Sequence, residues 1–226
     1  MRRPAAADGV CFDMDGVLVR SEEFWVAEQR GHILPTAAPN DEIPVSAITG
    51  RSYREVYPDL AAEYDVAVSR AEFEALFEEA GERIYGEQAR LLEGTNDLLS
   101  ALAARDTRIA LTTSSPHEWI ALVDDRFGVT EHLDVVVSAD DIDGPGKPAP
   151  GIYERGAAEL GVPPGDCVAV EDSTAGVRAA TGAGLYTVGF RGDCAVAPPR
   201  GDGADLSAAD EVVTGIDGLR ATLLGE

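Results

Sequence analysis

Cysteine is scarce in this chain of 226 residues. The sequence has three cysteines, Cys11, Cys167 and Cys194, in neither a CxxC pair nor a zinc-ligand spacing. An odd, dispersed set of this kind excludes a disulfide framework and a zinc module. We therefore expect Cys11 and Cys167, which fall within apolar segments, to be small buried residues.

Long hydrophobic runs are also missing. No segment reaches the 18 or so apolar residues that a membrane-spanning helix needs, and residues 1–8 lack the apolar stretch of a signal peptide. We therefore expect a cytoplasmic protein that does not bind membranes. No exposed apolar helix stripe requires a partner, so we also expect a monomer or a weak dimer.

Positive charge is the third scarcity. The chain carries 18 Lys and Arg against 41 Asp and Glu, giving a net charge of -23, and Lys147 is its only lysine. Such a charge repels nucleic acid and anionic membranes, which excludes polyanions as binding partners. A GC-rich genome can produce the arginine bias, but the charge balance favours a halophilic protein adapted to high salt.

This charge leads to a first prediction about stability. Acidic side chains repel one another in the folded state, and salt screens that repulsion. We expect the melting temperature, followed by circular dichroism, to fall when molar salt is replaced by dilute buffer. Full cooperative stability in dilute buffer would contradict the high-salt interpretation.

Apolar residues are plentiful, at 45% of the chain, and they form short strand-like runs separated by helical segments. Continuous apolar strands joined by helices predict an α/β fold with a doubly wound parallel sheet. Such a sheet binds ligands at the carboxyl ends of its strands. The expected strands are residues 10–13, 108–112, 135–138, 167–170, 185–188 and 211–213.

Residues 21–90 have a different character. They show little strand pattern, and their helical stretches are acidic on one side. A capping box at Ser69 and Glu72 begins one helix, and Ser21 is a candidate cap for another. We expect a small α-helical cap domain at 21–90, inserted into a core domain made of residues 1–20 and 91–226.

Two carboxylates stand at the end of the first expected strand. Asp13 and Asp15 are two residues apart, so period-two alternation directs both side chains to one site, and Gly16 lets the chain turn away. A plain acidic turn that caps the strand explains the same pattern equally well. These residues alone leave both interpretations open.

The next expected strand ends in hydroxyl residues. Thr113 and Ser114 precede a helix for which Ser115 is the expected N-cap and Pro116 the first residue. Hydroxyls and free backbone N–H groups at a helix N-terminus suit an oxyanion or a phosphate. An ordinary capped turn remains an alternative.

Two further strand ends carry charge. Lys147 lies in a stiff Gly-Pro-Gly-Lys-Pro loop, where its compact ammonium suits a phosphate. Glu171 and Asp172 follow a later strand, and paired carboxylates suit Mg²⁺, which keeps waters and a substrate phosphate as its other ligands. Capping of the next helix by Asp172 or Ser173 is compatible with that role.

Taken together, these segments resemble the four motifs of the haloacid dehalogenase-like (HAD) hydrolase superfamily. The motifs occur in the family's order, and the resemblance extends over the whole chain. The expected cap resembles that of the subgroup containing phosphoglycolate phosphatase and β-phosphoglucomutase. The matching segments are residues 12–18, 113–114, 146–150 and 170–173.

The resemblance implies roles for the acidic residues. Asp13 would be the nucleophile that forms an aspartyl phosphate, and Asp15 would protonate the leaving group and then activate water. Mg²⁺ would be held by Asp13, by the backbone carbonyl of Asp15 and by Asp172. Glu171 would support this metal site.

The same resemblance implies that Thr113, Ser114 and Lys147 bind the phosphoryl oxygens. The expected activity is Mg²⁺-dependent hydrolysis of a small phosphorylated metabolite, a phosphomonoester. A sugar-phosphate mutase and a non-catalytic binding protein on the same fold are the alternatives.

Some positions depart from the family pattern. Arg20 stands where an acidic residue is common, and Trp25 stands near the place where the mutase would have histidine, which weighs against a mutase. The cap loop near Gly50 and Arg51 is a candidate for substrate specificity, and His117 is a candidate for the mouth of the site.

Overall fold

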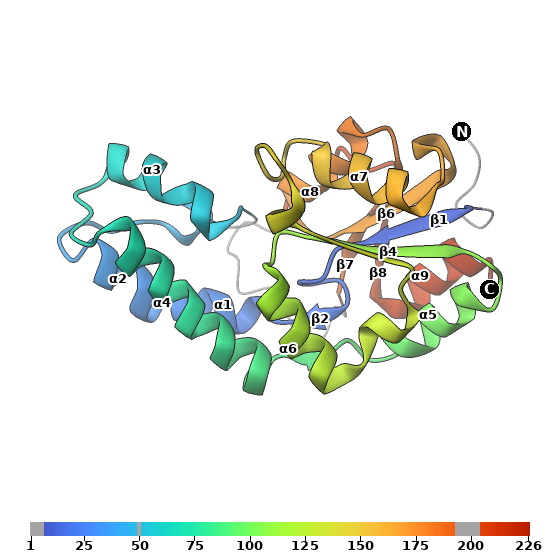
Figure 1. Ribbon diagram of the computed structural model, residues 1–226, viewed down its shortest axis with the longest axis horizontal. Coiled ribbons are helices and arrows are strands. Elements are labelled where there is room, and N and C mark those ends of the chain that lie inside the picture. Colours follow the sequence, from blue (N-terminus) through green and yellow to red (C-terminus); the bar gives the residue numbers. More distant parts are fainter. Residues whose placement is uncertain (1–6, 49–50, 193–203) are drawn as a thin grey trace.

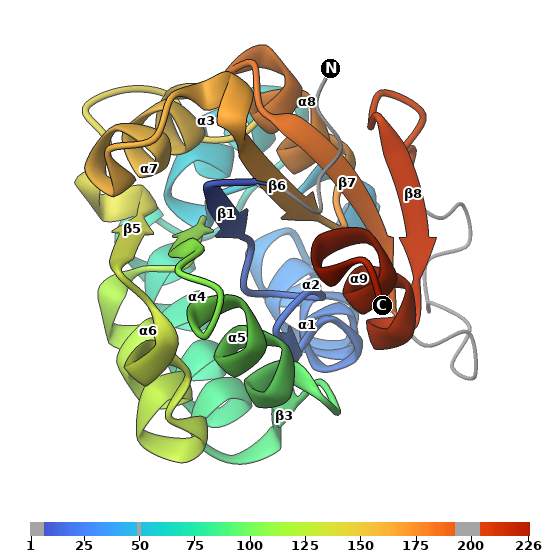
Figure 2. The ribbon, with the colours of Figure 1, turned by 90° about the vertical axis from the view of Figure 1, so that its right-hand side faces the viewer.

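The computed structural model describes residues 7–48, 51–192 and 204–226. Within these residues, one sheet has six parallel strands in the order β5-β4-β1-β6-β7-β8. Figure 2 shows helices on both faces of it, with α5 (Thr95–Ala103) and α9 (Gly215–Leu224) on one side and α7 (Gly151–Leu160) and α8 (Thr174–Gly182) on the other. The strands are β1 (Gly9–Phe12), β4 (Arg108–Thr113), β5 (Val135–Ser138), β6 (Cys167–Glu171), β7 (Tyr186–Arg191) and β8 (Glu211–Thr214).

This arrangement confirms the expected doubly wound α/β fold. The central strands β1 and β6 are buried along their whole length, as their continuous apolar sequences predicted. Cys11 and Cys167 are both buried free thiols. The helices are α1 (Glu22–Glu28), α2 (Leu34–Ala37), α3 (Tyr53–Glu63), α4 (Arg70–Arg83), α5 (Thr95–Ala103), α6 (His117–Phe127), α7 (Gly151–Leu160), α8 (Thr174–Gly182) and α9 (Gly215–Leu224).

Helices α1 to α4 project from one end of the sheet, and we refer to residues 21–90 as the cap (Figure 1). The Ser69 capping box is present at the start of α4. The chain passes from core to cap and back through two short strands, β2 (Val19–Arg20) and β3 (Arg90–Leu91), which pair with each other. The exact domain limits stay a prediction, and this short antiparallel pair is a feature that the sequence pattern did not predict.

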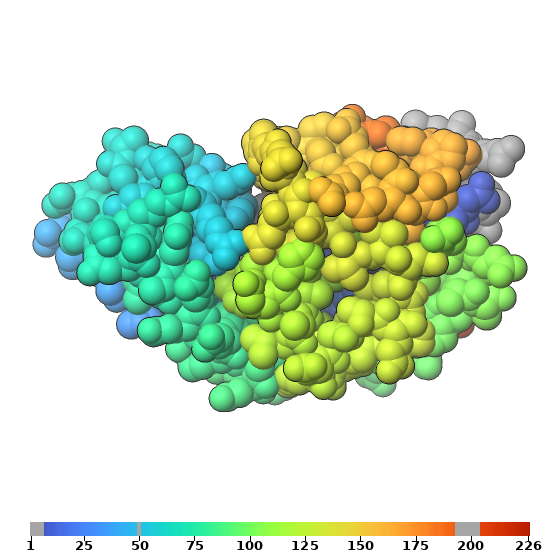
Figure 3. All heavy atoms as spheres, viewed as in Figure 1, coloured from blue at the N-terminus to red at the C-terminus, as the bar shows by residue number. Residues whose placement is uncertain are grey.

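The cap is seated on the core. Glu55 on α3 accepts a hydrogen bond from the backbone N–H of Gly146 at 2.9 Å, and Arg54 pairs with Asp140. Figure 3 shows the surface of α3 meeting the surface of the loop that precedes α7. The loop that carries Lys147 is therefore in direct contact with the cap.

The register of the sheet determines where the site forms. Phe12 in β1 is level with Leu111 in β4 and with Val170 in β6, so the ends of three neighbouring strands lie side by side. The residues that follow these strands therefore meet at one edge of the sheet. Among the described residues, no helix is both long and apolar enough to span a lipid bilayer.

Candidate active site

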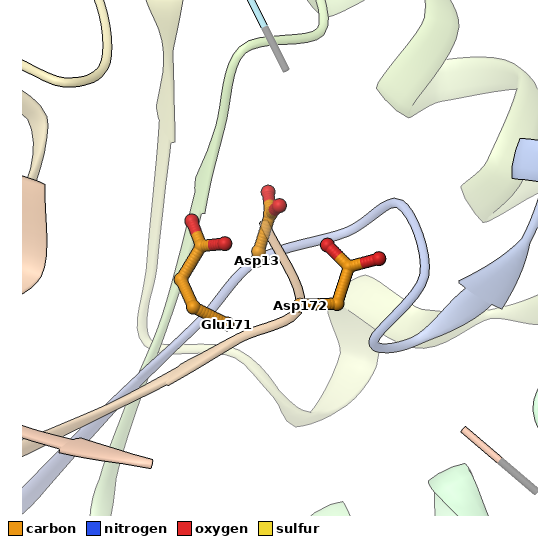
Figure 4. Close-up of side chains that lie close together, drawn as sticks. All are labelled: Asp13, Glu171 and Asp172. Atoms are coloured by element: carbon orange, nitrogen blue, oxygen red, sulfur yellow. The ribbon is translucent and has the colours of Figure 1, made fainter. Parts of the chain in front are cut away.

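The site begins with three acidic residues at adjoining strand ends. Asp13 follows β1, Glu171 ends β6, and Asp172 is the next residue (Figure 4). One carboxylate oxygen from each lies within 4.8 Å of the others. Oxygen donors at this spacing fit a small divalent cation such as Mg²⁺.

Lys147 neutralises part of this negative charge. Its buried Nζ lies 3.1 Å from Asp13 Oδ1, 2.6 Å from Glu171 Oε1 and 3.0 Å from the carbonyl oxygen of Thr112. Burial alone would lower the pKa of the Lys147 ammonium, but the Asp13 and Glu171 carboxylates raise that pKa above its ordinary value. The only lysine of the chain is therefore a fixed cation inside the site.

Glu171 has a supporting position. Its Oε1 also accepts from the hydroxyl of Tyr153 at 2.7 Å, and its Oε2 accepts from the hydroxyl of Ser173 at 3.0 Å. A Cβ at Gly176 would lie 1.8 Å from Glu171 Oε1, so this position requires glycine. Both carboxylate oxygens of Glu171 are therefore hydrogen-bonded, and Oε1 also contacts the Lys147 ammonium.

Neighbouring groups act in opposite directions on the pKa of Asp13. Burial and the Glu171 charge raise the pKa of Asp13 to about 8, although Lys147 acts in the opposite direction. One lysine therefore leaves the carboxylate cluster under-neutralised. A second cation at this position would remove the deficit, which is the electrostatic reason that the residues fit Mg²⁺.

The approach of Asp172 depends on Gly16. Gly16 has φ of +76°, and a Cβ there would lie 2.0 Å from Asp172 Oδ2. Glycine alone supplies both the left-handed backbone and the space. The glycine in the turn after β1 thus leaves room for the Asp172 carboxylate close to that of Asp13.

Asp15 lies in a separate environment. Its Oδ1 accepts hydrogen bonds from the hydroxyls of Ser21 and of Tyr85, the latter at 2.7 Å, and its Oδ2 accepts from Ser115 at 2.9 Å. Burial raises the pKa of Asp15 above its ordinary value, and these three bonds partly offset the effect. The side chain of Asp15 is therefore not part of the carboxylate cluster.

One expectation about helix capping was wrong, and a second was right in position only. Helix α6 starts at His117 with Pro116 as its N-cap, so Ser115 is not the cap and instead binds Asp15. Ser21 is the N-cap residue of α1, as expected, but its side chain makes no capping bond and its hydroxyl donates to Asp15 instead. The sequence marked both serines as polar helix starts, and only the fold reveals their shared partner.

One pocket collects the expected site residues. Its lining includes Asp13, Asp15, Thr113, Ser114, Lys147 and Asp172, whereas Glu171 is fully buried behind them. Thr113 is also buried, and its hydroxyl accepts a hydrogen bond from the N–H of Ser115 at 3.1 Å.

The opposite wall of the pocket comes largely from the cap. It contains aromatic rings that pack on one another, and Arg51, which pairs with Asp59 at 2.7 Å. Gly50 lies outside the described residues. His117 is not part of the lining and instead contacts Asp141 at 3.0 Å. The aromatic residues of the lining are Trp25, Tyr53, Phe77, Tyr85 and Trp119.

Comparison with known proteins agrees with this arrangement. The fold and site define a doubly wound α/β protein with an acidic centre at the strand ends. A family model described as haloacid dehalogenase-like hydrolase matches residues 7–184. The chain therefore belongs to the haloacid dehalogenase-like hydrolase family, as its motifs predicted.

Individual relatives support the assignment. The chain is 30% identical over 181 residues to a phosphorylated carbohydrates phosphatase of Thermotoga maritima, covering 80% of this chain and 83% of that protein. It is 29% identical over 189 residues to the validoxylamine A 7'-phosphate phosphatase of Streptomyces hygroscopicus subsp. limoneus, covering 79% and 83%. A crystal structure of a HAD family hydrolase from Deinococcus radiodurans R1, with bound phosphate and sodium, has a TM-score of 0.70 at 29% identity and covers 98% of this chain and 96% of that one.

Proposed function

We propose that the protein is a Mg²⁺-dependent phosphatase that hydrolyses a small phosphomonoester through an aspartyl phosphate on Asp13. One observation carries this proposal: a buried carboxylate at the end of β1 contacts a buried lysine, and a second aspartate lines the same pocket. The names of the relatives, which act on phosphorylated compounds, support the same chemistry.

The first step would transfer the phosphoryl group to the protein. An Asp13 oxygen attacks phosphorus, and the bond to the leaving oxygen breaks as Asp15 donates a proton to that oxygen. Lys147 and the hydroxyl residues Thr113 and Ser114 hold the phosphoryl oxygens. The product alcohol then leaves, and the phosphoryl group remains on Asp13.

The second step would reverse these roles. Asp15, now a carboxylate, takes a proton from water, and the water oxygen attacks phosphorus. The bond from phosphorus to Asp13 breaks, which releases phosphate and restores both aspartates. The separation of Asp15 from the carboxylate cluster supports a proton-transfer role for Asp15 and a nucleophilic role for Asp13.

Asp13, Asp172 and the backbone carbonyl of Asp15 would hold Mg²⁺, with Glu171 in support. The cation would offset the repulsion between the Asp13 carboxylate and an anionic phosphate. The acidic cluster and its incomplete neutralisation by Lys147 support this assignment. A soluble monomer or weak dimer in the cytoplasm, acting on a phosphorylated metabolite, is the corresponding biological setting.

The direct test is phosphate release from a panel of sugar, cyclitol and nucleoside monophosphates, in high salt and in dilute buffer. We expect release with Mg²⁺ and a loss of at least about 10²-fold with EDTA, restored by added Mg²⁺. Activity that is unaffected by complete chelation would contradict the metal assignment. Absence of release from every ester under all of these conditions would contradict the phosphatase.

A sugar-phosphate mutase is the second candidate. The resemblance of the cap to that of β-phosphoglucomutase favours it, whereas Trp25 in place of histidine weighs against it. Transfer of phosphate between positions of a sugar in the presence of a sugar bisphosphate would distinguish it from hydrolysis. A purely binding protein is disfavoured, because clustered buried charge is costly to keep without a catalytic use.

A further inference from the structure

The hydroxyls around Asp15 come from both sides of the cap boundary. Ser21 stands where the chain enters the cap, Tyr85 lies near its exit, and Ser115 belongs to the core after β4. Ser21 and Tyr85 both donate to Oδ1, whereas Ser115 donates to Oδ2. The cap thus anchors one oxygen of Asp15 with two hydroxyls, and the other oxygen has one hydroxyl partner.

The hydrogen bonds of Tyr85 have a defined direction. Trp25 Nε1 lies 3.0 Å from Tyr85 Oη and can only donate. The Tyr85 oxygen therefore accepts from Trp25, and its own single proton goes to the carboxylate of Asp15 at 2.7 Å. Ser115 Oγ lies farther from Tyr85 Oη, at 3.3 Å. Trp25 consequently fixes Tyr85 as a donor to Asp15.

The backbone position of Tyr85 is also fixed by its surroundings. Helix α4 continues into a π-helical turn, Ile84–Gln88, whose wider spacing changes the direction of the side chains that follow. Arg126, on core helix α6, donates to the carbonyl oxygen of Tyr85 at 2.6 Å. A helix of the core is therefore hydrogen-bonded to the cap turn that carries Tyr85, the residue that contacts Asp15.

Packing fixes the ring as well. The Tyr85 ring lies 5.3 Å from that of Trp119, measured between centroids, and Trp119 fits against Gly81 of α4. A Cβ at Gly81 would lie 2.2 Å from Trp119 Cε2, so only glycine admits this contact. Tyr85 lines the pocket but is only 1% exposed, so protein groups supply nearly all of its contacts.

We propose that Tyr85, oriented by Trp25, is a positioning residue that directs Asp15 toward the leaving oxygen of the substrate. Oδ2 is the oxygen that can exchange its single hydroxyl partner for the leaving group, because Oδ1 is anchored by the cap. Protonation of the leaving group then requires the cap to be seated on the core. This inference rests on the proposed phosphatase activity.

The test uses two substrates that differ in their need for a proton. A nitrophenolate leaves as a stable anion, whereas the alcohol of a sugar phosphate must be protonated as it departs. For Tyr85→Phe we expect kcat/KM, which reports on the first chemical step, to fall about 10²-fold with a sugar phosphate and less than about 3-fold with p-nitrophenyl phosphate. Trp25→Phe, which keeps a ring but removes the N–H, should shift the same ratio in the same direction by a smaller factor.

A matched control is available within the cap. The Tyr57 hydroxyl donates to the carbonyl oxygen of Val68 at 2.7 Å, away from the pocket, so Tyr57→Phe should leave the ratio of the two substrates unchanged. An equal loss on both substrates in Tyr85→Phe, or no loss on either, would overturn the positioning role. Wild-type protein that hydrolyses neither ester would instead overturn the proposed function itself, and the inference with it.

Discussion

Replacing Asp13 by asparagine is expected to reduce kcat for phosphomonoester hydrolysis by at least about 10⁴-fold, because an amide cannot attack phosphorus as a carboxylate does. The substitution preserves shape, and the amide oxygen can still accept from Lys147 at the position that Asp13 Oδ1 occupies. Steady-state phosphate release with the best ester of the panel measures the effect. Wild-type rates in this variant would contradict the assignment of Asp13 as nucleophile.

Loss of activity in this variant should not come from unfolding. Asp13 is a buried carboxylate next to the Glu171 carboxylate, and both burial and that charge disfavour its ionised form. Removing the charge therefore removes a repulsion, and we expect a melting temperature at or above that of the wild type when metal is chelated. Asp125→Asn, at an exposed position on α6, is the matched control and should retain full activity.

Much of the site could be predicted from the chain because it depends on local order. Strand periodicity placed Asp13, Thr113 and Glu171 at strand ends, and parallel strands bring their carboxyl ends to one edge. The isolated Lys147 and the Asp172 carboxylate followed from composition and spacing. One pocket is lined by Asp13, Thr113, Lys147 and Asp172, with Glu171 buried behind them, which agrees with these expectations. The roles assigned to these residues stay predictions.

The rest of the site depends on contacts that spacing does not encode. Tyr85 meets Asp15 across 70 positions of sequence, from a π-helical turn whose direction a 3.6-residue period cannot give. The sequence Ser-Pro-x-Glu is typical of a capped helix start and predicts Ser115 as the N-cap, but α6 begins at His117 with Pro116 as its N-cap. The β2–β3 pair has two residues per strand, which is too short for any alternation to show.

Replacing Lys147 by methionine is expected to destabilise the protein and to abolish most of its activity. Nζ is the cation shared by the Asp13 and Glu171 carboxyl groups, and Lys147 is 4% exposed, so methionine would leave this buried acidic pair without its cation. Loss of one partner of a buried ion pair costs about 3–5 kcal/mol. Loss of a charged donor to the phosphoryl oxygens should lower kcat/KM by at least about 10²-fold.

The destabilisation of this variant should depend on pH. Lys147 lowers the pKa of Asp13, which is nevertheless raised from 3.8 to about 8, so the variant should raise this pKa further. An acid whose pKa is higher in the folded state stabilises that state at low pH, and this contribution is lost as the pH rises toward the folded-state pKa. Both proteins lose this contribution in parallel until the pH reaches about 8, where the loss ends in the wild type and continues in the variant. Urea unfolding of the chelated proteins should therefore show a larger difference between variant and wild type at pH 9 than at pH 6.

A double variant separates charge from packing. Glu171→Gln removes one of the two anions that Lys147 neutralises, so Lys147→Met combined with Glu171→Gln should be less destabilised than the sum of the single changes. Strict additivity would mean that the 2.6 Å contact between Lys147 and Glu171 carries no net coupling. In that case any effect of the Lys147 charge on stability would come from its contact with Asp13, at 3.1 Å, and not from Glu171.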